Sequence, residues 1–125
     1  MYNPKPAIAT AFNTDASLVA LMPVTSMFNG VAVFATVPVY PYLVFSEIAN
    51  IPALSADDEE IESEVTVRVD IYGTATLSTI AGHVDRIIKA VGYTRNFAAD
   101  NDEVATTGEK IFHKTMSYSG TFTFV

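Results

Sequence analysis

The segment EVTVRVDIY, from Glu64 to Tyr72, decides the fold class. Its residues alternate between the two sides of an extended chain, with Val65, Val67, Val69 and Ile71 on one side and Thr66, Arg68, Asp70 and Tyr72 on the other. After Gly73 the apolar residues recur at steps of three and four, which predicts a helix over Ala75–Val91, closed by Gly92. A strand with one apolar face that leads into a helix with one apolar stripe indicates an α+β domain.

The size and composition indicate one domain over residues 1–125. Half of the 125 residues are apolar, so the chain can bury a core without disulfide or metal support. It contains no cysteine, which excludes a disulfide scaffold, a zinc–thiolate site and a thiol nucleophile. Near the amino terminus Lys5 is the only basic residue, and Asp15 interrupts the apolar stretch, so we expect no secretion signal and assembly in the cytoplasm.

Net charge and hydropathy restrict the possible partners. Fourteen acidic and seven basic residues give a formal charge of −7, which argues against direct nucleic-acid binding. DNA could still pass such a surface without adhering to it. The longest apolar run, Val31–Phe45, is broken by Thr36, Pro38 and Pro41 and is shorter than the roughly 20 residues of a membrane-spanning helix. We predict that it belongs to the protein core and that the protein contacts no membrane.

The remaining elements follow from apolar periodicity and from turn residues. The predicted elements are two short helices within Pro4–Met22, separated at Asn13–Asp15, and strands at Met27–Ala35, Tyr42–Ile48, Tyr93–Ala98 and Lys110–Val125. Asn29-Gly30 could instead form a turn before the first strand. Ala49–Ser63 and Ala99–Gly108 are predicted loops, and the last strand alternates as if one face were buried and the other exposed. The predicted order is α(α)-β-β-α-β-β, an antiparallel or mixed sheet of about four strands with helices packed on one face.

The sequence contains no recognisable catalytic, cofactor-binding or metal-binding motif. It lacks the glycine-rich phosphate loops and the nucleophile elbow, and His83 and His113 have no metal-ligand spacing. Arg68 and Asp70 share a strand face, and we predict that they form a structural ion pair. A small enzyme that uses Asp70 and His113 for acid–base chemistry, and a small-molecule binding domain, remain alternatives.

The acidic segment that begins at Asp57 is predicted to be a solvated loop or hairpin tip. Its candidate contact residues are Asp57, Asp58, Glu59 and Glu60. A run of like charges cannot pack against an apolar core without a large desolvation cost, so solvent exposure is the simpler interpretation. The alternative is a charged contact with a partner.

The order of these segments resembles the phage tail-completion proteins, which are related to the tail terminators and head-to-tail joining proteins of long-tailed phages. The segments that carry the resemblance are DASLVALM at 15–22, PYLVF at 41–45, VRVDIYG at 67–73 and SYSGTFTFV at 117–125. They extend over nearly the whole chain. They are patterns of burial and order, without a chemical signature.

The resemblance implies a structural virion protein without an active site or cofactor, assembled in the host cytoplasm. Such proteins form a ring, usually of six subunits, at the head-proximal end of the tail, where the ring terminates the tail tube and joins it to the head connector or stopper protein. DNA would pass through the lumen without specific binding, and the acidic segment would face the lumen or an adjoining ring. Val31–Phe45 and the aromatic carboxyl terminus would lie partly in subunit interfaces. Another neck or tail-tube adaptor protein of the same particle is the structural alternative.

Overall fold

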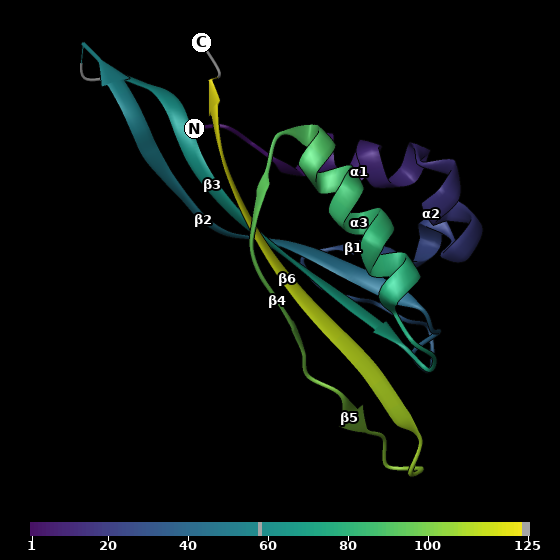
Figure 1. The fold of residues 1–125 in the computed structure, drawn as a ribbon. Helices are drawn as coiled ribbons and strands as arrows, with labels where there is room; N and C mark the ends of the chain where they lie inside the picture. The colour runs from purple at the N-terminus through teal and green to yellow at the C-terminus, as the bar shows by residue number, and fades with distance from the viewer. Residues whose placement is uncertain (58, 124–125) are drawn as a thin grey trace.

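A long, twisted sheet carries the helices on one face (Figure 1). The computed structural model describes residues 1–57 and 59–123. Within these ranges the elements are α1 (Lys5–Thr14), α2 (Ala16–Leu21), the 3₁₀ turn η1 (Val24–Ser26), β1 (Met27–Asn29), β2 (Tyr42–Ala56), β3 (Glu59–Gly73), α3 (Ser78–Val91), β4 (Thr94–Asp100), β5 (Glu103–Val104) and β6 (Lys110–Thr123). The α+β class is as predicted, but the described sheet has six strands instead of about four, and the order of elements differs accordingly.

The strands are arranged in the order β1-β2-β3-β6-β4, and β5 pairs with β6. All pairs are antiparallel except β1 with β2, where Met27–Asn29 runs parallel to Leu43–Phe45. The predicted strand Met27–Ala35 is therefore wrong beyond Asn29. Gly30 has a φ of 87°, a conformation that favours glycine, and it turns the chain out of the sheet. The Asn29-Gly30 turn thus follows the short strand and does not precede it.

The β2–β3 hairpin is much longer than predicted and projects from the body of the molecule (Figure 1). The prediction of a loop over Ala49–Ser63 is wrong, because pairing between the two strands continues from Ala49↔Thr66 to Ala56↔Glu59. Among the described acidic residues of this ribbon, Asp57, Glu59 and Glu64 are exposed and Glu60 and Glu62 are partly exposed, so their charge does not prevent the backbone from pairing. Register shifts after Glu47, Pro52 and Leu54 leave bulges in β2.

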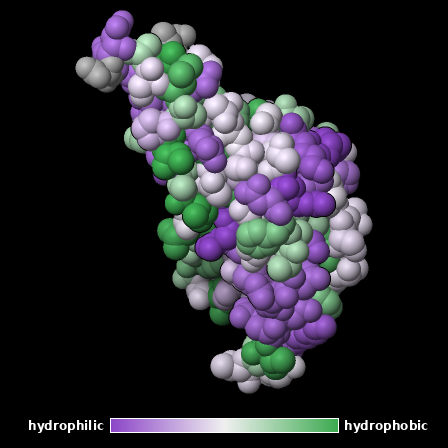
Figure 2. Space-filling view, turned by 60° about the vertical axis from the view of Figure 1, so that its left-hand side comes forward, coloured by the Kyte–Doolittle hydropathy of each residue, from purple (hydrophilic) through white to green (hydrophobic). Residues whose placement is uncertain are grey.

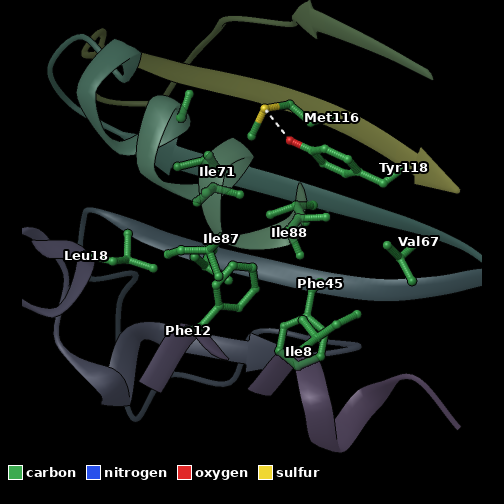
Figure 3. Close-up of a cluster of buried hydrophobic side chains, with 14 of the residues drawn as sticks. Ile8, Phe12, Leu18, Phe45, Val67, Ile71, Ile87, Ile88, Met116 and Tyr118 are labelled. Atoms are coloured by element: carbon green, nitrogen blue, oxygen red, sulfur yellow. Dashed lines mark hydrogen bonds between the residues drawn. The ribbon is translucent and has the colours of Figure 1, made fainter. Parts of the chain in front are cut away.

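The core lies between α1, α3 and the apolar face of the sheet (Figure 3). Val65, Val67, Val69 and Ile71 of β3 are buried there, as the alternation predicts. From the helices, Ile8, Phe12, Leu18, Ile87 and Ile88 pack against them. α3 begins at Ser78, slightly later than predicted, and Gly92 ends it in a left-handed conformation with a φ of 116°. The break between α1 and α2 falls at Asp15, within the predicted Asn13–Asp15 cluster.

The last strand departs from the predicted pattern in its middle. Met116 and Tyr118 face the core, but Thr115 and Ser117 on the opposite face are buried as well. β6 lies between β3 and β4, so its short side chains are covered by longer ones on both neighbours. Ser117, for example, is paired with Arg68 on one side and Phe97 on the other. A central strand can therefore bury small polar residues on a face that the sequence alternation assigns to solvent.

Candidate interaction surfaces

Asp70 is the centre of a polar cluster on the helix-free face of the sheet. Arg68 Nε donates to Asp70 Oδ2 at 2.9 Å, and Thr115 Oγ1 donates to Asp70 Oδ1 at 2.7 Å. His113 Nε2 lies 2.9 Å from the same Oδ1. Asp70 is only 7% exposed, and both of its carboxylate oxygens have partners. A buried carboxylate needs partners of this kind to offset the cost of its burial.

The structure thus brings together every residue that the sequence singled out on this face. Arg68 and Asp70 are in contact along β3, and His113 of the acid–base alternative joins them from β6. The geometry gives Asp70 three donors within 2.9 Å, which is the environment of a structural carboxylate. The assignment of Arg68 and Asp70 as a structural pair stays a prediction.

A row of aromatic rings crosses the same face beside this cluster. Tyr42, Tyr72 and His113 stack across β2, β3 and β6, with ring centroids 4.7 and 4.2 Å apart. Phe34 and Tyr40 pack against Tyr42 from the segment before β2. Burial, and secondarily the neighbouring Tyr72, raise the pKa of Tyr42 to about 12. These rings hold the segment that precedes β2 against the sheet.

A shallow hollow of about 310 Å³ lies at the edge of this row. Its lining combines apolar and charged groups: Gly30, Val31, Ala32, Tyr42, Val44, Ser46, Arg68, Asp70 and Tyr72. A second hollow of about 220 Å³ lies between the start of α3 and β6. The acids that line this second hollow, Asp100 and Asp102, are paired with Lys114 and Lys110. Neither hollow offers an unpaired catalytic acid.

The loop at residues 30–40, here called the valine loop, exposes a set of apolar side chains. Val31, Val33, Val37 and Val39 are between 61% and 71% exposed. The prediction that the whole run Val31–Phe45 belongs to the core is therefore wrong for these valines. Pro38 and Pro41 interrupt the run, so its first part cannot continue as a sheet strand. Exposed apolar side chains gathered in one loop mark a surface that associates with other molecules.

The acidic residues singled out from the sequence lie at the tip of the long hairpin. Asp57 and Glu59 are exposed there, and Asp58 lies outside the described residues. Glu60 accepts a hydrogen bond from Ser63 Oγ at 2.8 Å and lies 3.5 Å from the terminal amino group of Met1. Hydrophobic and hydrophilic residues are mixed along the projecting hairpin (Figure 2). Contact of the tip with a partner or with a lumen stays a prediction.

Over residues 1–57 and 59–123, no three His, Cys, Asp or Glu side chains are grouped so that they could hold a metal ion. In the same part of the chain, no helix is both long and apolar enough to cross a membrane.

Sequence reasoning missed the exposure of the valine loop and the aromatic row next to it. A usable signal was present in the sequence, since valines alternate at 31 and 33 and again at 37 and 39, around Pro38. A proline interrupts strand pairing, so such a run is not expected to form a buried strand. The aromatic row carries no such signal. It depends on the register Tyr42↔Tyr72↔His113 across three strands.

The sequence matches no protein-family model and no curated protein. The structure is similar to a chain of the virion of a native gene transfer agent (GTA) particle, with a TM-score of 0.51 and 12% sequence identity. The similarity covers 93% of this chain and 92% of that chain. At this identity the likeness concerns the fold. The chain therefore shares its fold with a chain of a gene transfer agent virion.

Proposed function

We propose that this chain is a structural protein of a phage-like particle that forms a ring at the head-proximal end of the tail. The ring terminates the tail tube and joins it to the head connector or stopper protein. The observation that supports this most is the fold shared with a virion chain over nearly the full length of both chains. The segments that resemble tail-completion proteins support the same role from the sequence.

The surfaces of the chain suit a protein that works in an assembly. The valine loop and the hairpin residues Ile48, Ile51 and Leu54 leave large apolar side chains exposed. In a ring, each subunit meets the next through two different patches, and apolar surface of this kind becomes buried. We therefore propose a homo-oligomeric ring, six subunits being the family expectation, with the tail tube protein and the connector as its other partners.

The acidic hairpin tip fits a position at the lumen or against an adjoining ring. Asp57, Glu59 and Glu60 carry like charges with no basic residue nearby in the sequence, since none occurs between Lys5 and Arg68. Such a surface repels the phosphates of DNA and lets a genome pass without binding. Against a ring, it would require a basic partner surface.

The test is the state of the chain alone and its presence in the particle. Mass measurement of the purified chain, followed by end-on imaging, should give a closed ring with a central hole. An open polymer would favour a tail-tube protein of the same particle instead. Proteomics of particles purified from the genome that encodes the chain should detect it, and particles from a gene-deleted strain serve as the control. Absence of the chain from complete particles would contradict the proposal.

A further inference from the structure

The outer side of β4 is an open sheet edge. β4 pairs with β6 on one side, and among the described residues no strand pairs with its other side. All seven of its residues are exposed. The regular part, Phe97–Asp100, contains neither proline nor lysine, the residues that commonly protect an edge from pairing. One bulge at Arg95–Phe97 precedes it.

The opposite edge of the same sheet is open along part of β2. β1 covers β2 only at Leu43–Phe45, and a hydrogen bond from Gly30 N to Phe45 O ends that contact. Beyond it, β2 pairs only with β3 within the described part of the chain (Figure 1). The open segment, here called the β2 edge, comprises Ser46–Ile51, since Pro52 has no N–H to donate. The amino-terminal segment does not block it, because Tyr2 bonds to Asn50 and Ser63 through their side chains.

The two edges carry matching side chains on the same face of the sheet. Phe97 pairs with Ser117, and Ile51 pairs with Glu64, so both lie on the helix-free face. Phe97 is 52% exposed and Ile51 is 53% exposed. Each has a small neighbour on its own strand, Ala99 and Ala49 respectively. If the sheets of two copies join at these edges with the helices of both copies on the same side, Phe97 of one copy and Ile51 of the other come together.

Charge favours a contact between different edges over a contact between like edges. The β2 edge contains Glu47 and continues into a hairpin without any basic residue. β4 carries Arg95 near its start and Asp100 at its end, and the partly exposed Arg95 contacts Asp85, as Lys89 does. Two β2 edges would bring together strands that carry Glu47 and no basic residue, whereas a contact between opposite edges brings the β2 edge to a strand that carries Arg95.

We propose that β4 of one copy pairs with the β2 edge of a neighbouring copy, so that the sheet continues from subunit to subunit. The partner at both edges is a second copy of this chain. Because the two edges differ, the contact repeats head to tail and closes into a ring when the rotation permits. The proposal names the subunit interface of the proposed ring and rests on that function.

Lysine substitutions at the two edges test the contact. Phe97→Lys and Ile51→Lys each place a charge where pairing would bury it, which weakens association by about tenfold or more. Val104→Lys is the matched control, because Val104 is 72% exposed on β5, which pairs with β6 beyond the end of β4 and so lies outside the proposed contact at Phe97–Asp100. All three positions are exposed, so circular dichroism and the thermal midpoint should match those of the unaltered chain. Sedimentation and native mass spectrometry then report the oligomeric state.

The expected result is an oligomer for the unaltered chain and for Val104→Lys, and loss of higher oligomers for the two edge variants. A mixture of the edge variants should form a one-to-one dimer, since Phe97→Lys keeps the β2 edge and Ile51→Lys keeps β4. A monomeric unaltered chain, edge variants that assemble normally, or Ile51→Lys that dimerises alone would overturn the proposal. If the chain is nevertheless found in particles, the proposed function stands without this interface.

Discussion

Asp15 connects the amino-terminal helices to α3. Its Oδ1 accepts a hydrogen bond from the backbone N–H of Leu18 at 3.0 Å and so caps α2. Arg86 of α3 donates to both carboxylate oxygens, at 2.9 and 3.0 Å. The Arg86 hydrogen bonds, and then the Leu18 bond, lower the pKa of Asp15 from 3.8 to about 2. One carboxylate thus fixes the break between α1 and α2 and docks it on α3.

A lowered pKa means that the unfolded chain takes up the proton first as the pH falls. The stabilisation by Asp15 is therefore complete above pH 3.8 and is lost as the pH falls through about 2. Asp15→Asn keeps a capping oxygen but loses the ionic bond, so its thermal midpoint should lie below that of the unaltered chain near neutral pH and approach it near pH 2. Arg86→Gln should reproduce this behaviour. A pH-independent difference would contradict the assignment.

The Asp70 cluster gives a prediction about stability. Asp70→Asn replaces an acceptor-only group with one that also donates, and it leaves the buried Thr115 hydroxyl and the partly buried donors of Arg68 and His113 imperfectly paired. We expect a loss of about 1–3 kcal/mol in the free energy of unfolding. Asp100→Asn is the control, since the side chain of Asp100 is 67% exposed and its removal from Lys114 should cost less than about 0.5 kcal/mol. Urea denaturation measures both, and equal losses would refute the structural role of the cluster.

At this scale the sequence predicts neighbours along one strand and misses those across strands. Arg68 and Asp70 are two residues apart, so a strand places them on one face whatever surrounds it. The contact of Asp70 with His113 and Thr115 depends on the register Asp70↔Thr115 and Tyr72↔His113. No local pattern specifies that register, because many offsets between two alternating strands bury the same apolar faces.

Elements with a buried stripe were predictable, and the exposed distal half of the β2–β3 hairpin was not. α3 has five buried residues at helical spacing and a terminal glycine, so its sequence indicates both its face and its end. The distal half of the β2–β3 hairpin buries little, and its acidic residues are typical of a loop. Its strands form because each pairs with its neighbour through the backbone, an interaction that leaves no apolar period in the sequence.

Two glycines of the α3 region should respond oppositely to alanine. Gly82 lies within the helix with no atom within 4 Å of an added Cβ, so Gly82→Ala should stabilise the protein by about 0.4–1 kcal/mol. Gly92 has a φ of 116°, and a Cβ there would lie 3.3 Å from the Phe122 ring. Gly92→Ala should therefore cost about 1–2 kcal/mol or more. Thermal unfolding of the two variants checks both signs, and a stabilised Gly92→Ala would show that the helix ends differently.

At the scale of the whole molecule, the sequence predicts the fold class but not which apolar segments are exposed. One alternating strand followed by one striped helix is sufficient for an α+β sheet with helices on one face. An apolar run such as Val31–Phe45 does not reveal whether the chain itself or a neighbour covers it. In the structure its first part is exposed in the valine loop and its last part is buried in β2. This division follows from tertiary packing, which no local pattern in the sequence reveals.

The position of the acidic tip leads to the last prediction. The acidic tip lies at the far end of the β2–β3 hairpin, and a second hairpin, β5–β6, lies at the other end of the sheet (Figure 1). Serine at Asp57, Asp58, Glu59 and Glu60 together should leave the folded body intact, since the distal hairpin is largely exposed. We expect it to reduce the yield of DNA-delivering particles, because the altered tip no longer repels DNA or no longer binds an adjoining ring.

Electron microscopy and a delivery assay separate the two causes. Fewer joined heads and tails would indicate a lost contact with an adjoining ring, whereas normal particles that deliver less DNA would indicate hindered passage. Glu103→Ser with Glu109→Ser, at exposed positions of the other hairpin, removes two acidic residues away from the tip and controls for a loss of acidic surface outside it. Because the formal charge is −7, the control chain stays acidic overall and should remain soluble. Normal yield from the tip variant would exclude both roles for the acidic tip.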